Sequence, residues 1–327
     1  MSSDSQQDFA LAFLSILFEG APFILLGTLI SGFIDVYLPP GTMDRFLPRN
    51  RKWAVVVAGL LGTVFPVCEC AVVPVIRRLV SKGLPVSCAL TYMLAAPIVN
   101  PITALSTWKA FQGQSAGVMT CSRLLLGFLV AVAVGLIVMR LPLCAVLKKS
   151  LVDSLAEKDA KNAKESGCCG GHSHDHTHHA QATSTGNDGD RLVAAFGSAM
   201  KDFVDVGVYF AIGVTITALF NTGIAPGAHW LDGLASNTTA APAALMALAF
   251  ILSLCSTSDA FIAATLDKFS WGAKLAFLTF GPMMDVKLLF LYQTVLRKRF
   301  IVFLAIGLFV AIGAITIFWQ HQLFQAR

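Results

Sequence analysis

The sequence predicts an all-α polytopic membrane protein made of two homologous halves. Hydrophobic residues make up 56% of the 327 residues and charged residues only 13%, a balance that soluble domains of this size do not show. Uncharged runs at 83–108, 206–231, 233–258 and 300–319 approach or exceed the roughly 20 residues that a helix needs to span a bilayer. The two parts of the chain also resemble each other at a nearly constant offset. Ordinary hydropathy gives about eight hydrophobic segments.

The charged residues and cysteines exclude several other classes of protein. The net charge of +5 comes from loops between apolar runs, so we do not expect nucleic-acid binding. Residues 1–8 carry acids and no bases, and the first apolar segment is therefore not expected to be a cleaved signal peptide. The eight cysteines are spread over apolar segments and one linker, unlike a secreted disulfide framework. No Walker sequence is present, so the chain itself brings no ATPase.

The chain divides into a first membrane repeat at 1–147, a linker at 148–190 and a second membrane repeat at 191–327. The first half is predicted to contain a span at 9–34 with Glu19 inside it, an interrupted segment at 53–76, a second interrupted segment at 83–108 and a last segment at 118–147. The second half opens with 191–220 and contains Gly281-Pro282 within 275–296. Proline in these apolar runs predicts helix breaks.

The repeat is visible as matched positions. A shift of 185 residues aligns Cys70 with Cys255, Pro97 with Pro282 and Asn100 with Asp285, and a shift of 186 aligns Glu19 with Asp205 and Gly27 with Gly213. Together these matches favour an internal duplication. Transporters are often built this way, with discontinuous helices forming a site at the interface of the repeats.

The basic residues predict the orientation of the halves. If 53–76 turns back as a re-entrant hairpin with Cys68 and Cys70 near its tip, the basic clusters at 49–52 and 77–82 share one side of the membrane. The basic residues at 148–149 and 297–299 fall on the same side, and the neutral loop at 221–239 lies opposite. The positive-inside rule then places the N-terminus outside and predicts inverted halves, each with three full spans and one hairpin. Eight simple crossings would leave a basic cluster outside.

The segment Cys68-Glu69-Cys70 is the main candidate for a substrate site. It lies between Pro66 and Pro74 in an otherwise apolar run. An ionisable residue in such a run is costly in lipid and indicates function, and broken helices are tolerated there only where protein or water covers the freed carbonyls. We expect the two thiols to be ligands and Glu69 to stabilise a cationic substrate or exchange a proton. The alternative is that the cysteines pack as small hydrophobes and that Glu69 pairs with a basic neighbour.

The second half and the interrupted segment at 83–108 supply further candidates. Cys255 is predicted to be a third thiol of the same site, because it is the repeat equivalent of Cys70; the alternative is packing at the interface. Asp259 and Asp285 are candidates for proton or cation coupling, since carboxylates inside membranes mark such relays. Alternatively, each is a neutralised contact with Lys287 or Lys274 as partner. Asn100 is a candidate neutral ligand, together with unwound carbonyls. The remaining cysteines at 88, 121 and 144 are expected to pack.

The linker differs in composition from the rest. It begins as a charged segment at 148–165 that is predicted to be helical, and a polar tract follows that can bury almost nothing and is predicted to be disordered. That tract holds Cys168, Cys169, His172, His174, His176, His178 and His179. Imidazoles and thiols are ligands for transition metals, so we expect a labile zinc- or copper-binding segment, with adventitious binding as the alternative. No cofactor is predicted to be required for transport.

The motif Pro66-x-Cys-Glu-Cys with Pro74, Arg77-Arg78 and the run Ala96-Pro-Ile-Val-Asn-Pro101 resembles the predicted permease family that includes the ArsP-type organoarsenical exporters. The resemblance covers 9–147 and 191–319. It implies a multi-pass permease of a prokaryotic inner membrane, which in some members exports trivalent organoarsenicals through membrane cysteines. The His-rich linker resembles that of relatives proposed to export copper or zinc.

The sequence therefore predicts a transporter and not an enzyme: a secondary efflux permease for a thiophilic metal or metalloid. An importer of a sulfur compound that uses the same thiols is the alternative. A membrane thiol-redox protein is less favoured, because Cys-x-Cys lacks the usual Cys-x-x-Cys spacing. The expected partners are lipid and a small ion or metalloid, and the sequence leaves a homo-oligomer open.

Overall fold

The computed structural model confirms an all-α polytopic architecture. It describes residues 3–38, 48, 50–65, 67–148, 151, 188–224 and 240–324. Within these residues there is no strand, and the single β-bridge joins Leu147 to Leu296. The predicted metal-binding linker residues Cys168, Cys169, His172, His174, His176, His178 and His179 lie outside the described residues, as does most of the neutral loop at 221–239.

The helices follow the apolar segments of the sequence. In the first half they are α1 (Ser3–Tyr37), α3 (Arg51–Val64), α4 (Glu69–Ser81), α5 (Val86–Ala95), α6 (Pro101–Ala110), α7 (Ala116–Val138) and the short α8 (Leu143–Val146). In the second half they are α10 (Asp188–Ile224), α12 (Ala240–Leu252), α13 (Ser258–Thr265), α14 (Trp271–Met283), α15 (Val286–Tyr292) and α16 (Lys298–Phe324).

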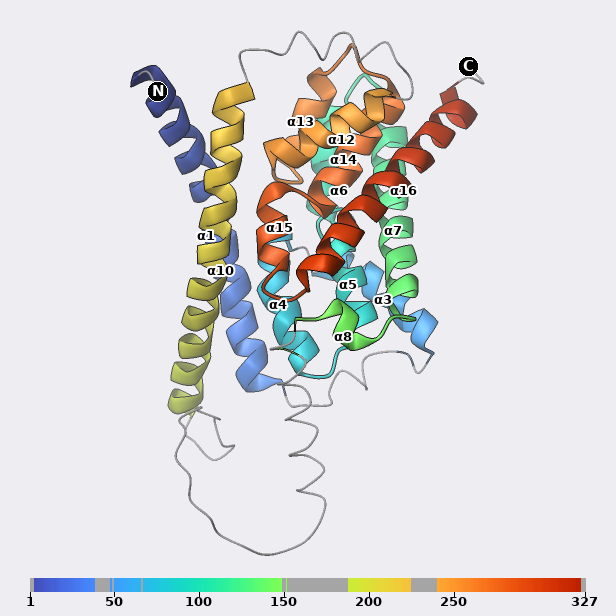
Figure 1. Cartoon of the computed structure of the whole chain (residues 1–327). Coiled ribbons are helices and arrows are strands. Elements are labelled where there is room, and N and C mark those ends of the chain that lie inside the picture. The colour runs from blue at the N-terminus through green and yellow to red at the C-terminus, as the bar shows by residue number, and fades with distance from the viewer. Residues whose placement is uncertain are drawn as a thin grey trace, which may run out of the picture.

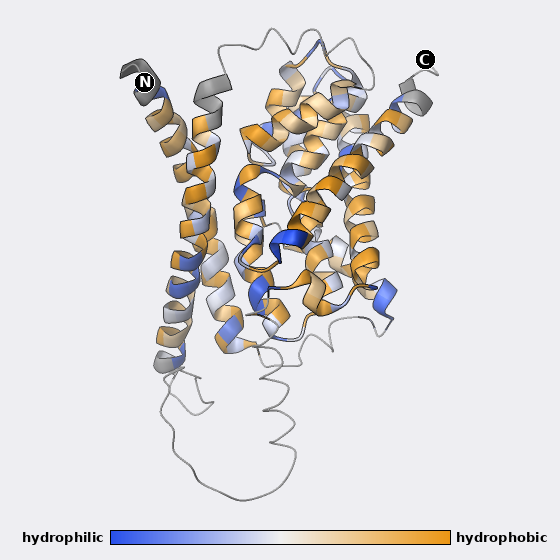
Figure 2. Ribbon diagram, viewed as in Figure 1, coloured by the Kyte–Doolittle hydropathy of each residue, from blue (hydrophilic) through white to orange (hydrophobic). Residues whose placement is uncertain are grey.

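Five stretches of the described chain are long and apolar enough to cross a membrane. They are Gln7–Tyr37, Ala116–Val138, Arg191–Leu219, Trp271–Tyr292 and Lys298–Gln320. The stretch Trp271–Tyr292, which contains α14 and α15, is the central one, because 89% of its apolar window is buried inside the protein, against 6–44% for the others. The other four carry exposed large apolar side chains, and their ribbons are mostly orange, the colour of hydrophobic residues, in Figure 2.

The helices form two groups (Figure 1). Helices α1 and α10 lie side by side along one edge of the molecule, and the remaining helices form a bundle around α14. The α1–α10 pair contacts the bundle mainly through α4 and α15. Both α4 and α15 are half-helices, so broken helices lie at the junction of the two groups.

Each break leaves backbone groups that side chains satisfy. Between α5 and α6, Asn100 is the N-cap, and its side chain accepts a hydrogen bond from the Ile102 amide at 2.9 Å. The Thr103 hydroxyl donates to the Pro97 carbonyl at 2.9 Å. Between α14 and α15, Asp285 is the N-cap and accepts from the Leu288 amide at 2.7 Å. The interruptions predicted from Pro97 and Pro282 are therefore present, although α14 continues one residue beyond Pro282.

The other two breaks lie at 65–68, between α3 and α4, and at 253–257, between α12 and α13. Cys68 is the extended N-cap residue of α4, with φ −72° and ψ 165°. Ser253 has φ 48°, a left-handed conformation that is uncommon for a residue with a side chain. Each half of the chain thus runs as a long helix, two broken helices and a second long helix.

Candidate functional site

A small cavity lies where the α1–α10 pair meets the broken helices. Its volume is about 20 Å³, enough for one water or a small ion, since a water needs roughly 10–15 Å³. The lining residues are Ile16, Glu19, Gly20 and Phe23 of α1, Phe210 of α10, Cys68, Glu69 and Cys70 at the start of α4, Cys255 in the α12–α13 break, and Lys287 of α15. The cavity therefore gathers three thiols and three charged side chains within an apolar surround.

The N-terminus of α4 positions the predicted Cys-Glu-Cys segment. Cys68 caps the helix, and Glu69 lies in its first turn, where the partial positive charge of the helix end favours a carboxylate. Helix α1 approaches closely at this level: a Cβ on Gly27 would lie 2.8 Å from the Ala71 Cα. Only glycine at position 27 allows this approach, so α1 forms a tight wall beside the segment.

Cys255 reaches the same cavity from the second half of the chain. It lies before α13, and the Thr257 hydroxyl donates to its Sγ at 3.6 Å. All six cysteines that the structure describes are free thiols. Within the described part of the chain, no three His, Cys, Asp or Glu side chains are arranged to hold a metal ion. Cys68, Cys70 and Cys255 thus share a cavity without forming a closed metal site in this conformation, and their role as ligands stays a prediction.

Lys287 is the electrostatic centre of the site. Its Nζ lies 3.3 Å from the Glu69 Oε1 and 3.6 Å from the Asp285 Oδ2. All three side chains are buried; Glu69 is only 2% exposed. The ammonium also donates to the carbonyls of Ser253 at 2.9 Å and Leu254 at 3.3 Å, which follow the end of α12. Lys287 therefore joins the first-half motif to both breaks of the second half.

The charges of this cluster do not balance, because two carboxylates face one ammonium. The Glu69 Oε2 is buried and has no hydrogen-bond partner among the residues that the structure describes. Buried polar atoms are nearly always paired, and an uncompensated buried charge is costly. One carboxylate oxygen of Glu69 at the cavity wall is therefore not paired with any described group.

The structure places Asn100 and Asp259 outside the cavity lining. Asn100 is buried and caps α6. Asp259 forms a buried ion pair in which both of its oxygens lie 3.0 Å from the Arg123 guanidinium of α7. The alternative interpretation of Asp259 as a neutralised contact named a lysine as partner, whereas the partner is Arg123. The predicted contact of Asp285 with Lys287 is present. The arginine was not predicted because it is distant in the chain and belongs to the other half.

Several residues of the site escaped sequence reasoning. The sequence indicates Lys287 only as a partner of the aspartates, whereas the structure also places it beside Glu69. Glu19 interrupts an apolar span, a signal of function that could have placed it in the site; its Oε1 accepts a hydrogen bond from Ser258 of α13 at 3.4 Å. Cys88 is buried, as expected for a packing residue, whereas Cys121 and Cys144 are exposed on the surface of the protein.

Two larger depressions lack this chemistry. A groove of about 950 Å³ between α7 and α16 is lined by apolar side chains, with Arg297 and Arg299 at one end. A second depression of about 820 Å³, lined by residues of α3, α5 and the 138–146 region, contains Cys88. Among the described residues, the groove has no thiol in its lining and the second depression has one, and neither is lined by a carboxylate.

Similar proteins agree with a membrane transporter. The chain is 37% identical over 301 residues to UPF0718 protein YcgR of Bacillus subtilis, an alignment that covers 92% of each chain. It is 33% identical over 290 residues to a Streptococcus mutans protein named "Putative two-component membrane permease complex subunit", covering 88% of this chain and 87% of the relative. No solved structure matches the chain significantly.

The model of the ArsP_1 family, described as predicted permeases, matches residues 6–319. The match spans both groups of helices and every residue that lines the cavity. This multi-pass membrane protein therefore belongs to the ArsP_1 family of predicted permeases.

Proposed function

We propose that the protein is a secondary efflux permease for a thiophilic metal or metalloid species, such as a trivalent organoarsenical or a copper- or zinc-like ion, in the inner membrane of a prokaryote. The observation that carries the proposal is the cavity lined by Cys68, Cys70 and Cys255 in a permease. Thiolates prefer soft and borderline species over hard ions, which take oxygen ligands. The protein then acts as a transporter and not as an enzyme.

The size of the cavity favours a small substrate. At about 20 Å³ it has room for a single small ion in this conformation, so a trivalent organoarsenical would require the cavity to widen. The rival function is import of a sulfur compound through the same thiols.

The charged cluster supplies the proposed coupling. Glu69 and Asp285 share the ammonium of Lys287, and Glu69 keeps one free buried oxygen. A cation that binds beside Glu69 would compete with Lys287 or with a proton on the carboxyl. Proton exchange at Glu69 and Asp285 would then accompany substrate binding. The ion pair of Asp259 with Arg123 favours a structural role for that aspartate over coupling.

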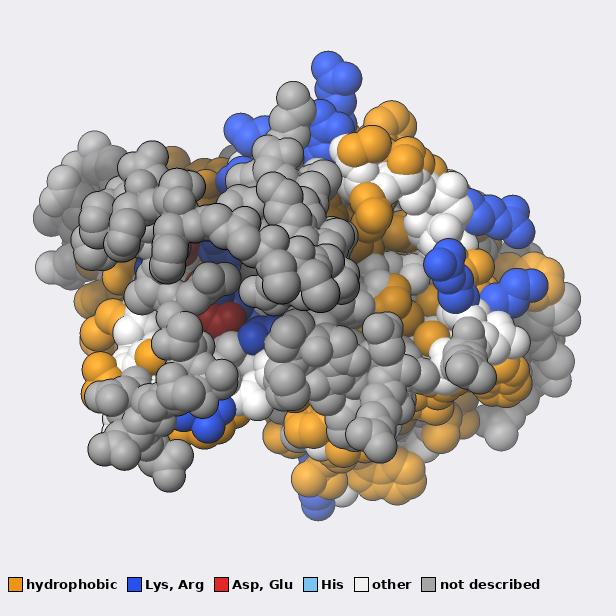
Figure 3. All heavy atoms as spheres, turned by 90° about the horizontal axis from the view of Figure 1, so that it is seen from below, with side chains coloured by type: hydrophobic (Ala, Val, Ile, Leu, Met, Phe, Trp, Pro, Cys, Tyr) orange, Lys and Arg blue, Asp and Glu red, His pale blue; other side chains and the backbone are white. Residues whose placement is uncertain are grey.

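The proposal includes inverted halves. Support comes from the repeated order of long and broken helices, and from the opposite directions of α1 and α10 in Figure 1. The α3–α4 pair lies in the lower part of that view and the α12–α13 pair in the upper part. Lys and Arg side chains are spread over the lower face, seen from below in Figure 3. By the positive-inside rule this face would be cytoplasmic.

Two further components belong to the proposal. The His/Cys-rich linker would bind zinc or copper and raise the local ion concentration near the permease. The name of the streptococcal relative describes a subunit of a two-component complex. We extend this to the present chain as a second protein component, with a homo-oligomer as the alternative.

A sensitivity panel tests the proposed function. Deletion and overexpression strains are grown with methylarsenite, arsenite, copper, zinc, cadmium or nickel, and cellular content of each element is measured. Export predicts that deletion sensitises cells to one of them and raises its content, and that overexpression does the reverse. Cys68→Ser at normal abundance should fail to restore resistance. A growth defect on one sulfur source without any ion sensitivity would instead support the importer.

A further inference from the structure

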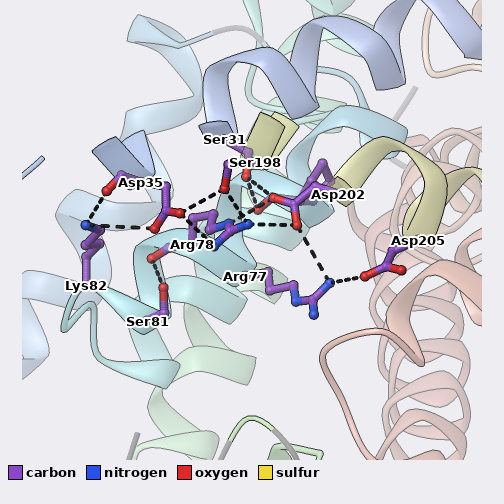
Figure 4. A network of polar contacts seen from close by, with 10 residues as sticks. Ser31, Asp35, Arg77, Arg78, Ser81, Lys82, Ser198, Asp202 and Asp205 are labelled. Atoms are coloured by element: carbon purple, nitrogen blue, oxygen red, sulfur yellow. Dashed lines mark hydrogen bonds and ion pairs between the residues drawn. The ribbon is translucent and has the colours of Figure 1, made fainter. Parts of the chain in front are cut away.

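The motif Arg77-Arg78 has no role in the cavity. At the C-terminal end of α4, basic side chains meet acidic and hydroxyl groups of α1 and α10 (Figure 4). We refer to Arg77, Arg78 and Lys82 with Asp35, Ser198, Asp202 and Asp205 as the ion-pair cluster. It joins the α1–α10 pair to the bundle at the end of α4 that is remote from Cys70.

Arg78 is the centre of the ion-pair cluster. Its Nε lies 2.9 Å from one oxygen of Asp202 and its NH2 lies 3.0 Å from the other, a bidentate pair. Its NH1 lies 3.0 Å from the Asp35 Oδ2, and its NH2 also donates to the Ser198 hydroxyl at 3.0 Å. One guanidinium on α4 therefore holds both α1 and α10.

Further polar contacts between α4 and the α1–α10 pair lie on both sides of Arg78. Arg77 lies 3.4 Å from the exposed Asp205, and the Lys82 Nζ donates to the Asp35 carbonyl at 2.6 Å. The Ser31 hydroxyl donates to Asp202 at 2.9 Å and lies 3.2 Å from the Pro74 carbonyl of α4. The three helices are thus tied along a full turn of α4.

The ion-pair cluster lies in line with the cavity. Arg78 follows Cys70 by eight positions on the same helix, which corresponds to about 12 Å at 1.5 Å per residue. Between them, the tight approach of Gly27 to Ala71 closes the space. On the opposite side, the exposed Glu19 makes a single polar contact within the described residues, with Ser258 at 3.4 Å. The cavity is therefore sealed more heavily toward Arg78.

The exposure of these ion pairs suits reversible opening. The side chains of Arg78 and Asp35 are 22% and 27% exposed, and Asp202, the bidentate partner of Arg78, is 4% exposed. In the other network Arg123 is 1% exposed and Asp259 is 4% exposed. Water can replace partners at a partly exposed pair at little cost, but separation of a fully buried pair leaves uncompensated charges. The two networks thus differ at the arginine: water can reach Arg78 and replace its partners, whereas Arg123 is fully enclosed.

We propose that the ion-pair cluster is a gate that closes the substrate path at the Arg78 end. Opening separates α4 from the α1–α10 pair, with Arg78 releasing Asp202 and Asp35, and connects the thiol cavity to the aqueous phase on that side. This inference rests on the proposed function for the claim that substrate follows this path. The opening itself is defined only by whether Cys68, Cys70 and Cys255 become accessible from that side.

Thiol accessibility tests the gate without any transported ion. In the full chain, the cysteines at 88, 121, 144, 168 and 169 are replaced by serine, which leaves the three cavity thiols. Labelling by a membrane-impermeant maleimide is timed in vesicles of both orientations. Asp202→Asn should speed labelling from the Arg78 face about tenfold, the population change that 1.4 kcal/mol produces. Asp205→Asn, at the exposed edge, should give a smaller rise.

Matched variants separate the gate from a general loss of structure. Arg140→Gln removes an exposed arginine outside the cluster and should leave labelling unchanged. The exchange Arg78→Asp with Asp202→Arg should return labelling toward the wild-type rate. Unchanged labelling in Asp202→Asn of normal abundance and elution overturns the gate, and so does an equal rise from both faces. Faster one-sided labelling combined with a negative sensitivity panel rejects the proposed function and leaves the gate standing.

Discussion

At the scale of single residues, the cavity combines sulfur from both halves of the chain. Cys68 and Cys70 come from the start of α4, and Cys255 comes from the α12–α13 break. The second half has Ser253 where the first has Cys68, so the thiols are arranged asymmetrically. Ser253 instead has a left-handed backbone conformation, and its carbonyl accepts a hydrogen bond from the Lys287 ammonium.

Substitution of Cys255 tests whether the three thiols act together. Cys255→Ser keeps the size of the side chain and removes most of its affinity for soft species. We expect it to reduce transport into everted vesicles about as much as Cys68→Ser or Cys70→Ser. Cys121→Ser is the control, because Cys121 is exposed and outside the cavity. Normal transport by Cys255→Ser, alongside loss in Cys68→Ser, would reject the three-thiol site.

The role of Asp259 is tested by a double-mutant cycle with Arg123. Arg123→Met leaves Asp259 buried without its partner and should destabilise the protein by about 3–5 kcal/mol. The double variant with Asp259→Leu removes both charges and should recover most of that loss. Apparent melting temperature in detergent and vesicle transport are measured for each. If the double variant transports, the Arg123–Asp259 pair has a structural role. If the double variant is stable but cannot transport, Asp259 takes part in coupling.

Sequence reasoning found the thiols and carboxylates of the site but not their partners. Cys68, Glu69 and Cys70 stand out because polar residues in an apolar run are unusual, and the repeat offset adds Cys255. The pairing of Glu69 with Lys287 joins positions 218 residues apart, and that of Asp259 with Arg123 joins positions 136 apart. Such pairs depend on how the halves pack, which no local pattern records.

At the scale of elements, prolines and caps predict interruptions better than their exact limits. The break after α5 is explained by Pro97 and by Asn100 as the N-cap of α6. Helix α14 ends at Met283, one residue after Pro282, and Asp285 is the N-cap of α15. Pro22 and Pro74, by contrast, lie inside α1 and α4. A proline within a membrane helix is tolerated when neighbouring groups satisfy the freed backbone, so proline alone does not fix a boundary.

Two glycines of α10 test how closely this helix must pack. A Cβ on Gly213 would lie 2.8 Å from the Lys287 Cα, whereas a Cβ on Gly207 would meet nothing within 4 Å. Gly213→Ala should push α10 away from α15, destabilise the protein by about 1–3 kcal/mol and impair transport. Gly207→Ala should be neutral or stabilising by about 0.4–1 kcal/mol. Equal melting temperatures for the two variants would contradict the close approach.

At the scale of the whole molecule, the linker is predicted to tune transport without performing it. Deletion of 168–179 removes the predicted metal ligands of the linker. Resistance should persist at high ion load, and any loss should be confined to low concentrations, where local capture matters. Replacement by a Gly/Ser segment of equal length is the control for linker length. Complete loss of transport at normal protein abundance would place the linker in the transport path.

The proposed inversion of the two halves determines which loops lie on the same side of the membrane. Contacts bring distant loops to common ends of the molecule: beside the Leu147–Leu296 bridge, the Lys148 amide donates to the Val295 carbonyl and the Arg297 amide donates to the Val146 carbonyl. At another end, Gln114 after α6 contacts Asp267 before α14 at 3.4 Å. Apolar patterns identify the segments, but a re-entrant pair and a simple crossing have the same composition, so hydropathy alone cannot separate six crossings from eight.

Cysteine labelling decides between these topologies. With six crossings and two re-entrant pairs, cysteines at Arg51, Lys82 and Arg299 should all label from the cytoplasmic face, because basic residues are retained there. Cysteines at Lys109 and Lys268, which flank the Gln114–Asp267 contact, should label only from the opposite face. The two groups control for each other in vesicles of known orientation. Labelling of positions 51 and 82 from opposite faces would mean that α3 and α4 cross the membrane, and the inverted relation of the halves would then be wrong.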